Sequence, residues 1–199
     1  MPNIGDSERK TQNRVVKFFR DKLHYTYLGD LHDSENRNIM QEQLHAWLLK
    51  QGYSEKLASN AVNTLVKTAT NLQQGLYHAN KEVYSLLKYG AKVKESVEQS
   101  PKTVYFIDFE DVSKNDFYIA EEVTIVSNNT KRPDIVLYVN GIALAVIELK
   151  KSSVSVSNGI RQNLTNQKAN FIEDFFTTIQ FCMAGNDSEG LRYGTLLTP

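Results

Sequence analysis

Cysteine is almost absent from this sequence, because Cys182 is the only one among 199 residues. A single thiol excludes an internal disulfide and a cysteine-rich zinc site, and it is typical of a reducing compartment. No apolar run approaches the length that spans a membrane. The first residues, MPNIGDSERK, lack the apolar core of a secretion signal. We therefore expect a cytoplasmic protein without membrane segments.

The sequence also has no excess of charge of either sign, because 23 lysine and arginine residues balance 23 aspartate and glutamate residues. Nucleic-acid-binding proteins commonly carry an excess of positive charge. Neutrality does not exclude DNA binding, but it requires that phosphate contacts come from a local group of cations. The sequence also lacks internal repeats and low-complexity linkers.

The first 90 residues carry apolar side chains at helical spacing. They predict four helices: one over 6–23, one from Ile39 that ends at Gly52, one that starts after Ser54, and one over 71–89. Residues 25–38 are polar and rich in turn formers, so we expect a loop there.

After Gly90 the pattern becomes that of strands, with β-branched and aromatic residues enriched. Predicted strands cover 103–109, 117–127, 134–139 and 142–150, a helical stretch covers 157–176, and further strands cover 178–185 and 191–197. This order predicts an α/β (α+β) fold in one compact domain, with a helical part over 1–90 packed on a core over 91–199. Within the second strand, Glu121 and Glu122 are expected to be exposed.

The stretch RPDIVLYVNGIALAVIELKKSS, residues 132–153, contains two apolar runs that meet at Asn140-Gly141, which predicts a β-hairpin. Both runs are apolar on both faces, as in central strands covered from two sides. Three charges interrupt them: Asp134, Glu148 and Lys150. In a structural interpretation these charges are solvated at strand ends. In a functional one they form a site, because a charge buried there needs a partner or a metal.

The spacing Pro-Asp-x(13)-Glu-x-Lys has a chemical meaning. Two carboxylates on neighbouring strands offer hard oxygen ligands for Mg²⁺. A bound metal polarises a phosphodiester and lowers the pKa of its water. The lysine can orient that water or offset negative charge on the phosphate. The functional interpretation is therefore phosphodiester hydrolysis.

The turn of the hairpin decides whether this site can form. A strict two-residue turn pairs Val139 with Ile142 and puts Asp134 and Glu148 on opposite faces of the sheet. A three-residue loop places both carboxylates on one face, about 7–8 Å apart at the Cα level. If the site exists, we predict either this longer loop or a compensating bulge.

The run from NDFYIAEEVTIV through the hairpin to FFTTIQFCMAGNDSEGLRYGTL resembles the N-terminal nuclease domain of type I restriction endonuclease R subunits. The segments YTYLGD, QGYS and HANKEVYSLLKYG resemble the helical lead-in of that subunit, so the resemblance covers nearly the whole chain. It implies a PD-(D/E)xK core, a mixed sheet flanked by helices. It also implies a DNA endonuclease that uses Mg²⁺, or Mn²⁺, and does not itself read the DNA sequence.

The resemblance also implies roles for single residues. By residue match, Asp134 and Glu148 would bind the metal and Lys150 would be the catalytic lysine. The backbone carbonyl of Leu149 is a further candidate ligand. Related nucleases use a glutamate of an early helix, for which Glu8 is the nearest candidate.

Glu122 and Gln162 are two further candidate residues of this site. Glu122 is a second candidate acid. Many members of the family carry Gln-x-x-x-Tyr on the helix after the lysine. Here Gln162 is followed four residues later by Asn166, and the alternative frame from Gln167 to Phe171 lacks the hydroxyl as well. Gln162 is therefore a candidate accessory catalytic residue without the tyrosine.

Five cations cluster in sequence around the motif: Lys131, Arg132, Lys151, Arg161 and Lys168. Such charges usually solvate a surface. Beside a phosphodiester site, however, they would supply the local positive patch that global neutrality withholds. Lys151, Arg161 and Lys168 are the candidate DNA-backbone contacts.

The R subunit of the resembled family continues into an ATP-driven DNA translocase. No G-x-x-x-x-G-K-[ST] phosphate loop occurs in these 199 residues, so ATP would bind only in a motor region outside them. The chain also ends directly after a strand-like run, and we expect a piece of a longer protein. The resemblance implies double-stranded DNA as substrate, with methyltransferase and specificity subunits as partners.

Two alternative functions remain open at this point. One is a non-catalytic module with a nuclease-like fold that docks partner subunits and holds DNA, which the helical first 90 residues support. The other is a free-standing repair nuclease with the same PD-(D/E)xK core.

Overall fold

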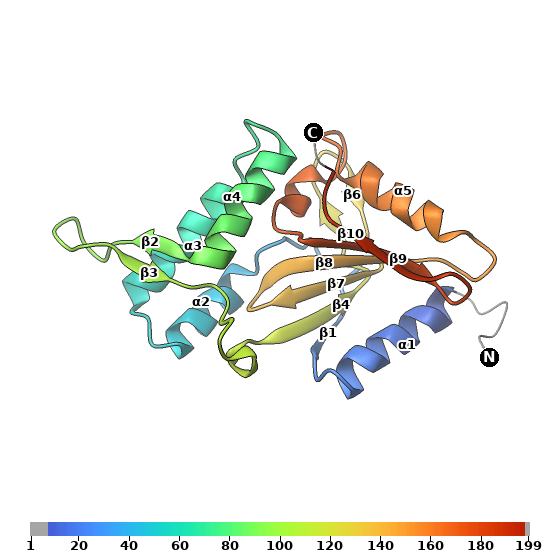
Figure 1. Ribbon diagram of the computed structural model, residues 1–199, viewed down its shortest axis with the longest axis horizontal. Helices are drawn as coiled ribbons and strands as arrows, with labels where there is room; N and C mark the ends of the chain where they lie inside the picture. The colour runs from blue at the N-terminus through green and yellow to red at the C-terminus, as the bar shows by residue number, and fades with distance from the viewer. Residues whose placement is uncertain (1–7, 198–199) are drawn as a thin grey trace.

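The computed structural model describes residues 8–197 and places a six-stranded mixed sheet between helices (Figure 1). The strand order is β1-β4-β7-β8-β9-β10. Pairs β1–β4 and β8–β9 are parallel, and the other three pairs are antiparallel. The strands are β1 (Thr26–Asp30), β4 (Phe117–Glu121), β7 (Ile135–Val139), β8 (Ile142–Leu149), β9 (Phe181–Asn186) and β10 (Gly190–Gly194). The predicted mixed sheet flanked by helices is confirmed.

Helices surround this sheet, and two small sheets lie outside it. The helices are α1 (Glu8–Asp21), α2 (Gln41–Lys50), α3 (Glu55–Ala69), α4 (Leu76–Tyr89) and α5 (Val156–Asn166), with the 3-10 turns η1 (Val112–Lys114) and η2 (Glu173–Thr177). The small sheets pair β2 (Ala91–Val93) with β3 (Lys102–Val104), and β5 (Ile125–Val126) with β6 (Thr130–Lys131). None of the helices within residues 8–197 is long and apolar enough to cross a membrane.

The four predicted N-terminal helices are present. Ser54 caps α3, because its hydroxyl accepts a hydrogen bond from the Leu57 N–H. The fourth helix starts only at Leu76, after Gly75 with a φ of 81°. The helical stretch predicted over 157–176 is two elements, α5 and η2, separated by turns.

The loop predicted over residues 25–38 is wrong at its start. Thr26–Asp30 forms the edge strand β1, which pairs in parallel with β4 and shifts register near Gly29, where φ is 103°. An edge strand keeps one side open to water, so its sequence need not be apolar. Pairing with β4, a long-range contact, therefore overrides the local polar pattern.

The faces of the sheet are covered differently. On one face, α1 contributes Val16, which packs against Ile135 and Ile147. On the other face, Val136 and Val146 pack with the region around η2. In Figure 1, α1 and α5 lie on opposite sides of the sheet. The central strands β7 and β8 are almost entirely buried, as their two-sided apolar pattern predicts.

Helices α2, α3 and α4 have a core of their own. Trp47, Leu65 and Val83 are buried together with residues of β2 and β3. Phe106 joins this core although it follows β3 without being in a strand, so the strand predicted over 103–109 is shorter than expected. Ile142, at the tip of the hairpin, connects this second core to the main sheet.

The hairpin between β7 and β8 has a two-residue turn followed by a bulge. Asn140 and Gly141 both have positive φ, 54° and 85°, as a type I′ turn requires. The turn pairs Val139 with Ile142, but the register then shifts, and Leu137 pairs with Ala145. Leu144 is thus the extra residue of β8. The predicted compensating bulge is confirmed.

Neighbouring segments hold the bulge in place. The carbonyl of Leu144 accepts a hydrogen bond of 2.8 Å from the N–H of Gln180, and the Ala143 carbonyl accepts one of 2.7 Å from the Thr178 hydroxyl. On the other side, the Ala143 N–H donates to the Asn38 carbonyl at 2.8 Å. Three backbone groups at the bulge therefore have partners from outside the hairpin, which helps to stabilise a buried bulge.

Asn140 should contribute to stability through both its backbone and its side chain. Its side-chain Nδ2 donates to the Phe106 carbonyl and to Oδ1 of Asn115, and its side-chain Oδ1 accepts from the Asp116 N–H. We predict that Asn140→Gly lowers the free energy of unfolding by about 2–3 kcal/mol, because buried partners lose their hydrogen bonds. Asn140→Ala should cost about 1 kcal/mol more, since alanine is strained at positive φ. Urea denaturation measures the free energy of unfolding of both variants. Equal values for the two would contradict the predicted cost of alanine at a positive φ.

Candidate active site

Asp134 and Glu148 lie on the same face of the sheet. Beyond the bulge, Ile135 pairs with Ile147, so the next step of the same register sets Asp134 opposite Glu148. The Leu149 N–H donates a hydrogen bond of 2.6 Å to Oδ2 of Asp134. This bond fixes the Asp134 carboxylate beside β8, which brings the two predicted acids together.

Glu148 is fully buried, with 0% of its residue surface exposed. Neither of its carboxylate oxygens has a hydrogen-bond partner among residues 8–197. The nearest cation is the Lys150 ammonium, whose Nζ lies 4.0 Å from Oε2 and donates at 2.9 Å to the Leu149 carbonyl. A buried carboxylate without hydrogen bonds is costly, so its oxygens are available for another ligand.

Both carboxyls hold their protons more tightly than usual. Burial raises the pKa of Asp134 to about 6, although the Leu149 N–H and the Lys150 charge act in the opposite direction. Burial also raises the pKa of Glu148 well above its ordinary value, and the negative charge of Asp134 adds to this effect. One ammonium cannot compensate two adjacent buried carboxylates, so the site favours an additional positive charge.

The donor set is small and made of oxygen. Within residues 8–197, no group of three histidine, cysteine, aspartate or glutamate side chains forms a metal cage. The available donors are the carboxylates of Asp134 and Glu148, with the Leu149 carbonyl between Glu148 and Lys150 in sequence. Two carboxylates and a carbonyl are hard donors that match Mg²⁺ or Mn²⁺, which retain several water ligands. The residues present therefore fit such an ion in kind.

Glu8 reaches the site from α1. Its Oε1 lies 4.0 Å from the Lys150 Nζ, and its side chain is 43% exposed. Its negative charge also raises the pKa of Asp134 and Glu148. Of the additional acids predicted for the site, Glu8 is thus the one in contact with the lysine.

Glu122 lies nearby but is engaged elsewhere. Its N–H donates to the Asp134 carbonyl at 2.9 Å, while its carboxylate pairs with Arg132 at 2.9 Å and with Arg9 at 3.7 Å. Arg132 is thus part of an ion pair. Lys131, its neighbour, lies over the Phe171 ring.

The expected exposure of Glu121 is wrong, because this residue is 4% exposed. Strand alternation turns Glu121 toward α1. There its carboxylate accepts hydrogen bonds from the Tyr27 hydroxyl at 2.6 Å and from Gln12 at 2.9 Å. Arg9 approaches it at 3.2 Å. These partners come from α1 and from a strand that the sequence did not predict, so a polar environment could not be foreseen.

The C-terminal candidates surround α5. Lys151, Arg161 and Lys168 are exposed, and Arg161 donates to Ser157 and Asn158 of its own helix. Gln162 is half-buried on α5, and none of its contacts in the described residues is a hydrogen bond to the two acids or the lysine. These four residues therefore lie close to the motif in sequence, but within residues 8–197 none of them forms a hydrogen bond or ion pair with its acids or its lysine.

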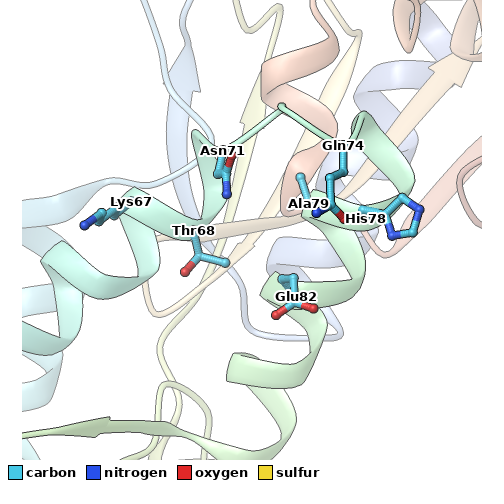
Figure 2. A pocket seen from close by; sticks show the side chains of 7 residues that line it. All are labelled: Lys67, Thr68, Asn71, Gln74, His78, Ala79 and Glu82. Atoms are coloured by element: carbon cyan, nitrogen blue, oxygen red, sulfur yellow. The ribbon is translucent and has the colours of Figure 1, made fainter.

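Helix α5 packs closely over Glu148. A Cβ at Gly159 would lie 3.0 Å from the Ala184 Cβ and 3.5 Å from the Glu148 Cβ. Glycine therefore permits the helix to approach the sheet at this point, and it helps to exclude water from the buried acid. The cleft drawn in Figure 2 lies elsewhere, between α3 and α4; it has a volume of about 360 Å³ and is lined by polar residues such as Lys67 and His78.

Gln12 is the residue that sequence reasoning missed. It is 2% exposed and lies on the face of α1 that also carries Glu8 and Val16, at intervals of four residues. A glutamine one helical turn before the apolar positions Val15 and Val16 of an amphipathic helix is the signal that would have indicated it. Such a residue is buried only if it has hydrogen-bond partners.

The raised pKa of Asp134 predicts a pH-dependent stability in the absence of divalent cations. The folded state binds this proton more tightly than the unfolded chain. The stability that protonated Asp134 contributes is therefore fully present below about pH 4, and it is lost as the pH rises through about 6. A rise from 3.8 to about 6 corresponds to about 3 kcal/mol, since one pKa unit is worth about 1.4 kcal/mol.

Asp134→Asn keeps the hydrogen bond from Leu149 but removes the charge. We predict that this variant is up to about 3 kcal/mol more stable than the wild type at pH 8, and equally stable at pH 4. Denaturation in EDTA measures the difference, with Glu42→Gln at an exposed position as the control. A difference that does not change with pH would contradict the prediction.

Comparison with known proteins identifies the family of the chain. Residues 6–199 match the family described as type I restriction enzyme R protein N terminus. The chain is 34% identical over 163 residues to the type I restriction enzyme HindI endonuclease subunit of Haemophilus influenzae, covering 75% of this chain and 15% of that protein. It is 29% identical over 138 residues to the putative type I restriction enzyme MjaIXP endonuclease subunit of Methanocaldococcus jannaschii, covering 65% of this chain and 13% of the relative.

These alignments confirm the resemblance seen in the sequence and also define its extent. The chain spans only 13% and 15% of the length of these two relatives. The family match, in contrast, extends over nearly all of the chain, including the helical part, the hairpin and the last strands. The chain belongs to the family of N-terminal domains of type I restriction enzyme R proteins.

Proposed function

We propose that this domain is the Mg²⁺-dependent DNA endonuclease centre of a type I restriction enzyme, with a PD-(D/E)xK core. The relatives are named endonuclease subunits, which supports nuclease chemistry in the family. The observation that carries the proposal for this chain is Glu148, a fully buried carboxylate opposite Asp134 and beside Lys150 that has no hydrogen-bond partner in the part of the chain that the structure describes. A binding site for a divalent cation accounts for an acid in this position.

Each residue has a separate task in this proposal. Asp134 and Glu148 hold the ion with carboxylate oxygens, and the Leu149 N–H orients the Asp134 carboxylate. When bound, Mg²⁺ or Mn²⁺ polarises the phosphodiester and makes a water molecule more acidic. Lys150 places its ammonium beside Glu148, where it offsets the negative charge that develops on the phosphate.

The substrate in this proposal is double-stranded DNA. Only short parts of the relatives are covered, so the remaining functions would lie outside this domain. We assign ATP-driven translocation to the longer protein and target recognition to a specificity subunit, which assembles with it together with methyltransferase subunits. Gln162 remains a proposed accessory residue, because it lies on α5, the helix that covers Glu148.

The helical part favours a second, compatible function. Helices α2 to α4 bury their own core and contain none of the proposed catalytic residues. This part is suited to docking a partner subunit or holding DNA while the sheet carries the acids. A free-standing repair nuclease is less well supported, because the family match covers the chain as the N terminus of a longer protein.

Removing the metal ligand or the lysine should abolish cleavage. In the full-length subunit assembled with its partners, we predict that Asp134→Ala and Lys150→Ala each lower the rate of supercoiled plasmid cleavage by about 100-fold or more. Cleavage is measured with Mg²⁺ and ATP on agarose gels. Lys92→Ala, at an exposed lysine of β2, is the control and should cut at the wild-type rate. Normal cutting by both site variants would refute the catalytic assignment.

The exposed cations should act on DNA affinity through charge. We predict that Lys151→Ala, Arg161→Ala and Lys168→Ala combined reduce the slope of log affinity against log salt by about 2–3, since each phosphate contact contributes about 0.9. Fluorescence anisotropy at several salt concentrations measures this slope. The matched control removes three exposed lysines in and next to β2 and β3, Lys92, Lys94 and Lys102. An equal change in both triple variants would show a general effect of charge.

A further inference from the structure

Gln12 is a buried polar residue that the proposed chemistry does not use. It lies near the middle of α1, and its side chain faces the ends of two strands. Its Nε2 donates to Oε2 of Glu121 at 2.9 Å, to Oε1 of Glu122 at 3.1 Å and to the carbonyl of Asp134 at 3.3 Å. One side-chain amide thus joins α1 to the end of β4 and to the first residue of the proposed site.

The surroundings of Gln12 require an uncharged donor. Glu121 also accepts from the Tyr27 hydroxyl and lies 3.2 Å from Arg9. Glu122 is paired with Arg132. Because these carboxylates already have cationic partners, the amide supplies the remaining donors without adding a charge to a buried cluster.

Two contacts of this helix bear directly on the metal-binding acids. The Asp134 carbonyl accepts from Gln12 and from the Glu122 N–H, so its backbone is held from both sides. Glu8 lies one helical turn before Gln12, and its carboxylate is 4.0 Å from the Lys150 Nζ. The bonds of Gln12 therefore fix two parts of the site at once.

We propose that Gln12 is a positioning residue of the nuclease centre: its amide holds the Asp134 backbone and the helix that carries Glu8 in the arrangement that binds the cation. This inference rests on the proposed nuclease function. Gln12 does not touch the substrate or the ion. It acts through Asp134 and Glu8, and its loss should alter metal binding as well as the cleavage rate.

The test compares Gln12→Met and Gln12→Glu with Thr11→Val. Methionine keeps the length of the side chain but removes the donors, whereas glutamate places a further carboxylate opposite Glu121 and Glu122. Thr11 is the neighbouring buried residue of α1, and it bonds to Asp187 in the β9–β10 turn at 2.8 Å. Thr11→Val therefore loosens the same helix at a contact that does not involve the site.

Three measurements are made on the full-length subunit assembled with its partners. Plasmid cleavage is followed as a function of Mg²⁺ concentration, Mn²⁺ binding is measured by electron paramagnetic resonance without nucleotide, and ATP hydrolysis reports the folded motor. We expect Gln12→Met to lower maximal cleavage by about 10- to 100-fold and to raise the Mg²⁺ requirement. The Mn²⁺ ion whose binding is lost in Asp134→Ala is the one bound at the proposed site. The affinity for this ion should be lower in Gln12→Met. Gln12→Glu should be more impaired, and Thr11→Val should match the wild type.

The outcomes separate this inference from the nuclease assignment. If Gln12→Met cleaves and binds Mn²⁺ like the wild type while Asp134→Ala is inactive, Gln12 has no positioning role and the nuclease assignment stands. Equal losses in Gln12→Met and Thr11→Val would also overturn the inference, because they would reflect general loosening of α1. If Asp134→Ala cuts normally, the proposed function itself fails, and the role of Gln12 fails with it.

Discussion

One extra residue in β8 determines which way the acids of this domain face. Side chains of a strand alternate between the two faces, so a shift of one residue moves every following side chain to the other face. The type I′ turn alone would set Glu148 on the face opposite Asp134. The bulge at Leu144 reverses this assignment, and the hydrogen bonds from Thr178 and Gln180 stabilise it. The proposed centre depends on this backbone feature before any side-chain chemistry.

Burial of the acids lowers the stability of the folded state, and apolar packing in the surrounding strands offsets this loss. Burying Glu148 without hydrogen bonds raises its pKa and destabilises the ionised form at neutral pH. The central strands offset this through the apolar residues that bury both of their faces, each worth about 1.5–3 kcal/mol when fully buried. A rigid, well-packed hairpin can therefore hold a group that is unfavourable by itself, as is common where function requires it.

Sequence reasoning recovered the features that depend on local pattern or on covalent spacing. The hairpin and its need for a longer loop or a bulge follow from turn chemistry and strand alternation, and the start of α3 after Ser54 follows from helical periodicity. The edge strand β1 and the burial of Glu121 do not, because each depends on a partner far away in the chain: β4 for the strand and α1 for the carboxylate. A polar residue has no local signature that tells whether a partner will come from another element.

The packing of α1 shows why the first helix cannot be treated as a separate lead-in. Val16 is its buried aliphatic residue and Val15 and Phe19 pack beside it, whereas Thr11 and Gln12 are buried as polar residues. The helix is thus attached through directed bonds as well as apolar contact, and directed bonds fix its position more specifically than non-directional apolar contact can. Glu8, at the start of this helix, is aligned with Lys150 by those bonds. The proposed centre is therefore built from two distant parts of the chain: the hairpin, which carries the acids and the lysine, and helix α1, which the buried polar side chains of Thr11 and Gln12 help to hold in place.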